Sequence, residues 1–158
     1  MQSVPAAFPG GDEAREVQHA IDMLVELIPD AHDRAYPVRV QRACRESFAM
    51  NARLLIDFVT GDSPRDILAS HFVDGAWNRP ERVGDVGDVW KWASANVAHT
   101  SKERTQDLTY DVAEARMLEI ARVVVVLLDG WVTAVERSAH PDAAALRSSI
   151  VKAQSLLA

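Results

Sequence analysis

The sequence predicts an all-α fold: one helical-bundle domain made of four main helices with short accessory ones. Three observations lead to this prediction. Apolar residues recur at steps of three and four along most of the chain, which is the period of a helix with one buried face. No segment alternates apolar and polar residues for long enough to be a strand. The chain has 158 residues, 48% of them apolar, so one domain can bury a sizeable core without disulfides or a metal.

The first helix follows a short leader. Residues 1–11 contain two prolines and two glycines and are expected to be flexible, so the folded domain is predicted to cover residues 12–158. Asp12 is suited to cap the first helix, and Pro29 is expected to end it. The apolar stripe between them consists of Val17, Ala20, Ile21, Leu24, Val25 and Ile28.

The second helix is predicted from Pro37 to about Thr60, with Gly61 as its C-terminal stop. Its stripe consists of Val40, Cys44, Phe48, Asn51, Leu55, Phe58 and Val59. Asn51 is a polar residue in an apolar stripe, and two interpretations stay open: it bonds to a neighbour at the edge of the stripe, or it faces a shared polar site. Cys44, the only cysteine, is expected to act as a small apolar residue.

A short helix and a third main helix follow. The Ser-Pro pair at 63–64 favours a short helix that runs to about Phe72. Residues 73–84 are rich in Gly, Pro, Asn and Asp and predict a loop, which Trp77 is expected to anchor to the bundle. The third main helix is predicted over about 85–98. Its stripe consists of Val86, Val89, Trp90, Ala93 and Val97.

The fourth helix is predicted over about 109–137, with Asp111 and Glu114 at the spacing of a capping box. The four β-branched residues 123–126 favour a strand by propensity. The helical period continues on both sides of them, so they are assigned to the helix and expected to be buried on more than one face. A last helix begins after the His-Pro-Asp at 140–142. The stripes of these two helices are Ala113, Met117, Ile120, Val124, Leu127, Leu128, Trp131 and Val135, then Leu146, Ile150, Ala153 and Leu157.

The charge balance argues against a general affinity for nucleic acid. Asp and Glu total 23 against 17 Lys and Arg, so the formal net charge is -6 and a phosphate backbone is not attracted. The start lacks the cationic stretch and apolar run of a signal peptide. The longest apolar run, 123–128, is far too short to cross a membrane. We therefore expect a cytoplasmic protein that does not contact a membrane.

Motifs for metals and cofactors were not found. Gly84 and Gly87 are isolated and form no phosphate-binding loop, and the chain has no CxxC or HExxH motif. No two of the five histidines are three or four residues apart. The spaced carboxylates Glu13 and Glu16 look like part of a solvated helix face. Neither a metal nor a cofactor is therefore expected.

Two segments resemble a group of bacterial helical proteins. The first is ESFAMNARLLIDF, residues 46–58, with a polar residue near its middle followed by an Arg and then an Asp-Phe pair. The second is NVAHTSKER, residues 96–104, in which His99 follows an Asn by three positions and precedes basic residues. The resemblance covers about residues 42–104. This group is similar to the HEPN superfamily, which implies a HEPN-like four-helix bundle.

HEPN proteins are often dimers, and many are metal-independent ribonucleases of toxin–antitoxin and phage-defence systems. Their motif is an Arg followed by four to six residues and then a His. The His moves a proton at the ribose hydroxyl or the leaving oxygen, and the Arg stabilises charge on the phosphate. Before His99 that window holds Trp92, Ala93 and Ser94, none of them basic. Arg104 follows the His, so it does not match the motif.

Local spacing adds two expectations. Asn96 and His99 share a helix face if the helix continues that far, and three interpretations of His99 stay open: it caps the helix end, it belongs to a ligand or catalytic site, or it is exposed by chance. Arg53 and Asp57 are four residues apart and are expected to form an ion pair if exposed.

Three hypotheses follow, and whether the protein is an enzyme stays open. The leading one is a HEPN-like binding or regulatory protein with a degenerate polar site, linked to a toxin–antitoxin or phage-defence system. The residues expected in that site are Glu46, Asn51, Asp57 and Asn96. The second is an endoribonuclease that uses His99 and Arg104, and the third is a structural dimerising bundle. The resemblance implies a homodimer and an antitoxin-like protein partner, whereas the net charge gives no indication of RNA.

Overall fold

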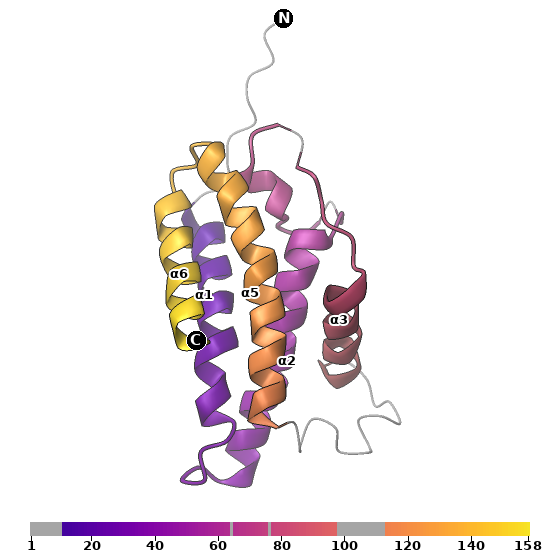
Figure 1. Ribbon diagram of the computed structural model, residues 1–158, viewed down its shortest axis with the longest axis vertical. Helices are drawn as coiled ribbons and strands as arrows, with labels where there is room; N and C mark the ends of the chain where they lie inside the picture. The colour runs from indigo at the N-terminus through magenta and orange to yellow at the C-terminus, as the bar shows by residue number, and fades with distance from the viewer. Residues whose placement is uncertain (1–10, 64, 76, 98–112) are drawn as a thin grey trace, which may run out of the picture.

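The computed structural model describes residues 11–63, 65–75, 77–97 and 113–158, and within them it contains helices but no strand (Figure 1). The helices of this described part are α1 (Gly11–Asp30), α2 (Val38–Thr60), the 3₁₀ helix η1 (Ala69–Phe72), α3 (Gly84–Val97), α5 (Glu114–Arg137) and α6 (Ala143–Leu156). The predicted all-α class is confirmed.

Four helices form a bundle, and α3 packs on its outside. Neighbours along the chain pair as hairpins, α1 with α2 and α5 with α6, and contacts of α2 with α5 and of α1 with α6 close the ring. α3 lies against α2 and touches α5 at its edge (Figure 1). α2 therefore has one side in the core and another under α3, so much of its length is covered.

An aromatic cluster fills one end of the core. The fully buried Trp131 of α5 packs edge-on against Phe58, with ring centroids 4.7 Å apart, and against Phe72, at 5.5 Å. Its Nε1–H donates a hydrogen bond of 3.1 Å to the carbonyl oxygen of Ala69. The cluster thus fixes η1 to both α2 and α5.

Two helix boundaries differ from the prediction. Pro29 lies within the last turn of α1, which ends at Asp30, because the neighbouring Ala31 N–H still donates to Leu27 O at 2.9 Å. Of the short helix expected up to Phe72, the described residues contain only η1. Leu68, the residue before η1, has an extended backbone, and its side chain is buried. The carbonyl oxygen of the next residue, Ala69, accepts the hydrogen bond from the Trp131 indole.

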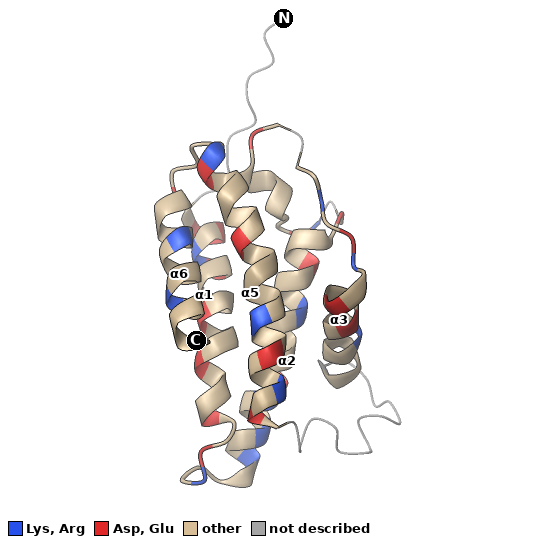
Figure 2. Ribbon diagram, in the orientation of Figure 1, with Lys and Arg blue, Asp and Glu red and all other residues tan. Residues whose placement is uncertain are grey.

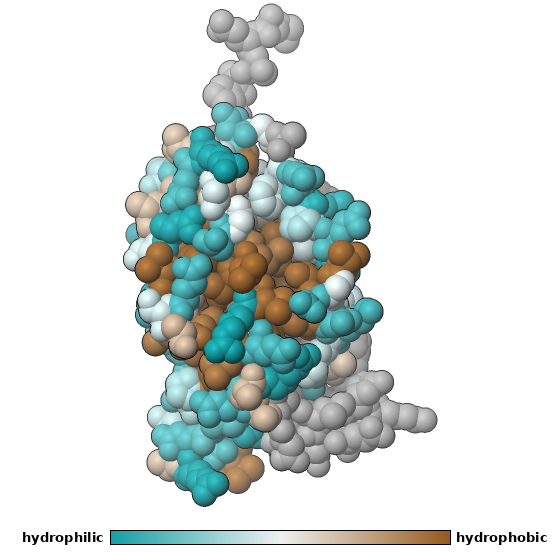
Figure 3. Space-filling model, in the orientation of Figure 1, coloured by the Kyte–Doolittle hydropathy of each residue, from teal (hydrophilic) through white to brown (hydrophobic). Residues whose placement is uncertain are grey.

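The valine run of α5 is helical, as the period predicted. Val124 and Val125 are both buried, so more than one side of the helix is covered there. Val126 is 72% exposed, so the predicted burial is wrong for that residue. Figure 3 shows apolar residues gathered over the middle of this helix. The expected start of the helix near residue 109 and the capping residue Asp111 lie outside the described residues.

Two further expectations are confirmed. The loop indole of Trp77 packs against the core, and its Nε1–H points to Val59 O at 3.5 Å, so it anchors the loop. Cys44 is half-buried against the core. Burial raises the pKa of its thiol, and the nearby Asp30 raises it further, so the unreactive thiol form is favoured.

Acidification is expected to destabilise the fold through His140. The side chain is completely buried beside Phe72, in a turn where Ala139 has a left-handed φ of 52°. Its Nδ1 accepts the Asp142 backbone N–H at 3.1 Å, which requires an unprotonated Nδ1. Burial lowers the pKa of His140, although the carboxylate of Asp142 opposes this shift. The unfolded chain therefore binds the proton first, and stability falls as the pH drops below about 6.5.

Urea unfolding followed by circular dichroism, at about pH 7.5 and about pH 5.5, measures this loss. The variant His140→Asn keeps an acceptor for the turn but does not titrate, so its stability should change less between the two conditions. An equal acid sensitivity in the variant would assign the loss to other groups.

Candidate functional site

The two predicted asparagines are bonded within their own helices. Asn51 is buried on α2, and its Nδ2–H donates to the carbonyl oxygen of Ser47 at 2.8 Å. Asn96 is buried on α3 and donates in the same way to Trp92 O at 2.7 Å. For Asn51, this bond corresponds to the first of the two interpretations given above, a bond to a neighbour on the same helix. Each of these bonds uses one N–H of the side-chain amide and stays within its own helix, so neither bond joins α2 to α3.

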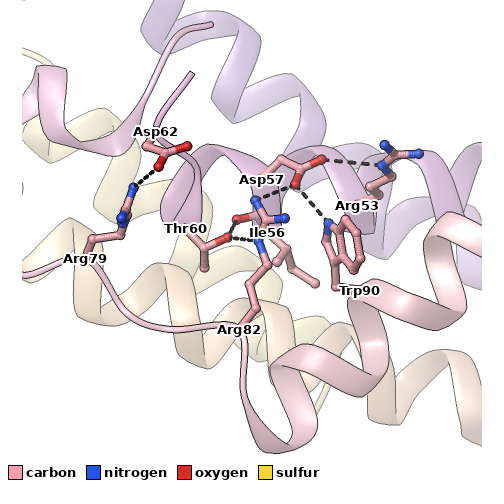
Figure 4. A network of polar contacts seen from close by, with 8 residues as sticks. All are labelled: Arg53, Ile56, Asp57, Thr60, Asp62, Arg79, Arg82 and Trp90. Carbon is pink, nitrogen blue, oxygen red and sulfur yellow. Dashed lines mark hydrogen bonds and ion pairs between the residues drawn. The ribbon is translucent and has the colours of Figure 1, made fainter. Parts of the chain in front are cut away.

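The other predicted site residues are placed differently. Glu46 is half-buried on α2. His99 and Arg104, the two residues of the ribonuclease hypothesis, lie outside the described residues. Asp57 does connect separate elements, and its carboxylate is the centre of the polar network in Figure 4.

The Asp57 carboxylate holds three donors. Its Oδ1 accepts the indole Nε1–H of Trp90 at 2.9 Å and lies 2.8 Å from Nη2 of Arg82. Its Oδ2 lies 3.4 Å from Nε of Arg53, so the predicted ion pair of α2 is present. α2, the loop before α3 and α3 itself therefore meet at one carboxylate (Figure 4).

Arg82 extends this network along α2. Its Nε donates to Oγ1 of Thr60 at 2.6 Å, and the same hydroxyl donates to Ile56 O at 2.7 Å. The guanidinium also lies over the Trp90 ring, 4.9 Å from the centroid, where the ring face attracts a cation. The Asp57 carboxylate and the Arg82 guanidinium thus both make contacts that join α2, the loop before α3 and α3 itself. We interpret this cluster as the clamp that holds α3 on α2.

An open groove of about 760 Å³ lies beside the clamp, between α1 and α2. Residues of α1 form one wall, α2 forms the floor, and Arg82 and Trp90 stand at the other side. Three of its apolar side chains keep large exposed fractions: Met50 with 44%, Leu54 with 53% and Ile67 with 41%. The groove therefore presents apolar surface to solvent in a concave site, which is typical of binding sites.

Sequence reasoning missed this groove and two residues of the clamp. Met50 and Leu54 lie outside the predicted apolar stripe of α2, so large apolar residues on the polar side of a helix were the available signal. Trp90 was assigned to the apolar stripe of its helix, although its indole also donates to Asp57. Arg82 gave no signal because its partner is 25 residues away in the sequence.

The described residues give no sign of a metal site or a membrane span. No three His, Cys, Asp or Glu side chains among them gather closely enough to hold an ion. None of the helices in that part of the chain is both long and apolar enough to cross a bilayer. In the view of Figure 2, charges of both signs are mixed over the bundle and do not form one basic face.

Comparison with known proteins found no protein-family model, curated protein or solved structure that matches this chain.

Proposed function

We propose that this chain is a binding module that receives an amphipathic α-helix of a partner protein in the groove between α1 and α2. The observation that supports the proposal is the exposure of Met50, Leu54 and Ile67 in one concave site. Burying such side chains contributes about 25 cal/mol for each Å² removed from water. A partner with its own apolar stripe supplies the surface that covers them.

The shape of the groove favours a helix as the occupant. Its floor runs along α2 from Ser47 to Gly61, which at about 1.5 Å a residue corresponds to about 21 Å. A helical segment of about 14 residues has this length. Met50 and Leu54 are one turn apart on the floor, so they present the ridge against which side chains at i and i+4 of a second helix pack.

The resemblance to HEPN proteins supplies the biological setting of the proposal. It supports a regulatory role in a toxin–antitoxin or phage-defence system, with an antitoxin-like protein as the source of the helix. It also supports a cytoplasmic homodimer, and light scattering tests this, because a monodisperse monomer at high concentration would exclude both the dimer and the purely structural alternative.

Substitution of Leu54 tests the groove. The probe is a fluorescein-labelled peptide of about 14 residues with leucines at i, i+3, i+4 and i+7 and glutamine or alanine elsewhere. Fluorescence polarisation should show binding, and Leu54→Glu should weaken it about tenfold or more, because a carboxylate replaces an apolar contact. Val151→Glu on α6 is the matched control, since Val151 is 51% exposed and lies outside the groove.

Two results would reject the proposed groove. One is the absence of any polarisation change up to about 1 mM protein. The other is equal peptide affinity for the wild type and the Leu54→Glu variant. Circular dichroism of both variants confirms that neither substitution has unfolded the bundle.

Metal-independent ribonuclease activity through His99 and Arg104 is the alternative function, although Arg104 follows His99 and so departs from the HEPN motif. The binding proposal predicts that highly purified protein with a chelator leaves RNA intact between about pH 5 and about pH 9. Cleavage that disappears in the His99→Ala variant would establish the ribonuclease instead.

A further inference from the structure

We infer that the helix received by the groove carries basic residues where it lies over the C-terminal end of α2. This inference rests on the proposed function. It adds the sign of the partner's charge and the end of the groove at which that charge lies. It follows from which charges of the groove are already neutralised.

The carboxylates of the groove fall into two kinds. Asp57 is paired with Arg53 and Arg82, so the clamp as a whole carries one net positive charge. Asp62, which also lines the groove, is paired with Arg79. Glu16 and Asp66 also line the groove, but they form no ion pair with any residue that the structure describes. Both are exposed. The groove therefore has two unneutralised carboxylates at its rim.

These two carboxylates lie at the same end of the groove. α1 and α2 run antiparallel (Figure 1), so Glu16, near the start of α1, lies beside the end of α2. Asp66 belongs to the segment that follows this end, and Gly61, the residue after the last turn of α2, also lines the groove. The C-terminal end of α2 also carries the negative end of the helix dipole.

The opposite end of the groove has a different character. Met23, Ser47 and Met50 line it, and no carboxylate of the described residues lies among them. The clamp, with its one net positive charge, lies near the same end of α2 as the two carboxylates, because Arg82 binds Thr60, but it stands on the α3 side of the groove and not on the α1 side. A partner helix with a continuous apolar stripe is therefore best accommodated when its lysines or arginines lie toward Glu16 and Asp66, away from Trp90.

The same charges disfavour two other occupants. A second copy of this chain carries a formal net charge of -6, so it is disfavoured as the occupant of this acidic groove. An anionic lipid surface would meet the unneutralised carboxylates directly. A basic segment of another protein avoids both repulsions and gains from the helix dipole.

The test uses three peptides that share the leucine stripe described above and differ at the polar positions near their ends, which carry lysine, glutamine or glutamate. Wild-type protein at low ionic strength should bind the lysine peptide about three- to tenfold more tightly than the glutamate peptide. Added salt of about 0.5 M should reduce that preference, because it screens exposed charges.

The double variant Glu16→Gln/Asp66→Asn should lose the preference and keep its affinity for the glutamine peptide. The matched control is Asp88→Asn/Glu119→Gln, which removes the same charge from α3 and α5 at exposed positions outside the groove and should keep the preference. Equal binding of all three peptides by the wild type would overturn the charge inference and leave the groove proposal intact. A preference that survives in Glu16→Gln/Asp66→Asn would also overturn it, whereas binding of none of the peptides would reject the proposed function itself.

Discussion

Replacing Trp131 with alanine is expected to lower the free energy of unfolding by about 3 to 5 kcal/mol, the largest loss of any single substitution considered. The indole is fully buried, and its rings contact Phe58 and Phe72. Its removal leaves a cavity where α2, η1 and α5 meet. It also leaves the Ala69 carbonyl without its donor. Urea unfolding followed by circular dichroism measures the loss.

Two further variants separate the causes of this loss. Trp131→Phe keeps much of the ring volume but cannot donate to Ala69, so we expect a smaller cost of about 1 to 3 kcal/mol. Leu156→Ala removes an exposed apolar side chain and should change the stability by about 0.5 kcal/mol or less. A Trp131→Ala variant as stable as Leu156→Ala would show that the cluster does not hold the core.

Replacing Asp57 with alanine should loosen α3 and cost about 1 to 3 kcal/mol. The variant leaves the Trp90 indole and the Arg82 guanidinium without their shared acceptor. The charged groups are about one third exposed, and solvent screening keeps the value below that of a buried ion pair. Native-state hydrogen exchange should show the amides of α3 exchanging faster while those of α5 change little.

Asp62→Ala is the matched control for the clamp. Asp62 pairs with Arg79 at 3.1 Å, but its side chain is almost wholly exposed. Its loss should change the free energy of unfolding by about 0.5 kcal/mol or less. If Asp57→Ala and Asp62→Ala have the same small effect, the clamp interpretation is wrong and α3 is held by apolar packing.

Local pattern was sufficient to predict the helices. The apolar stripes place α2 and α6 within a residue or two of their bounds, and the helical period correctly overrode the β-propensity of residues 123–126. η1 shows the limit of such reasoning. Its length depends on Leu68 entering the core and on Trp131 taking the Ala69 carbonyl, which are contacts between distant parts of the chain.

The candidate site was predicted less well for the same reason. Arg53 and Asp57 were identified because their four-residue spacing makes them neighbours on any helix. The partners of Asp57 in the following loop and in α3 depend on how those segments dock, which spacing along α2 does not encode. The groove likewise arises from the pairing of α1 with α2.

The contact between the first and last helices has a consequence for synthesis on the ribosome. Lys152 of α6 bridges Asp22 and Glu26 of α1, at 3.2 and 2.7 Å, and Gln18 reaches Ser149 across 131 positions of sequence. α1 can pair with α2 as soon as both have emerged, yet one side of α1 stays uncovered until α6 arrives. The side of α1 that α6 covers therefore stays exposed until the last helix has been made, and exposed surface of this kind is where a nascent chain is open to wrong contacts.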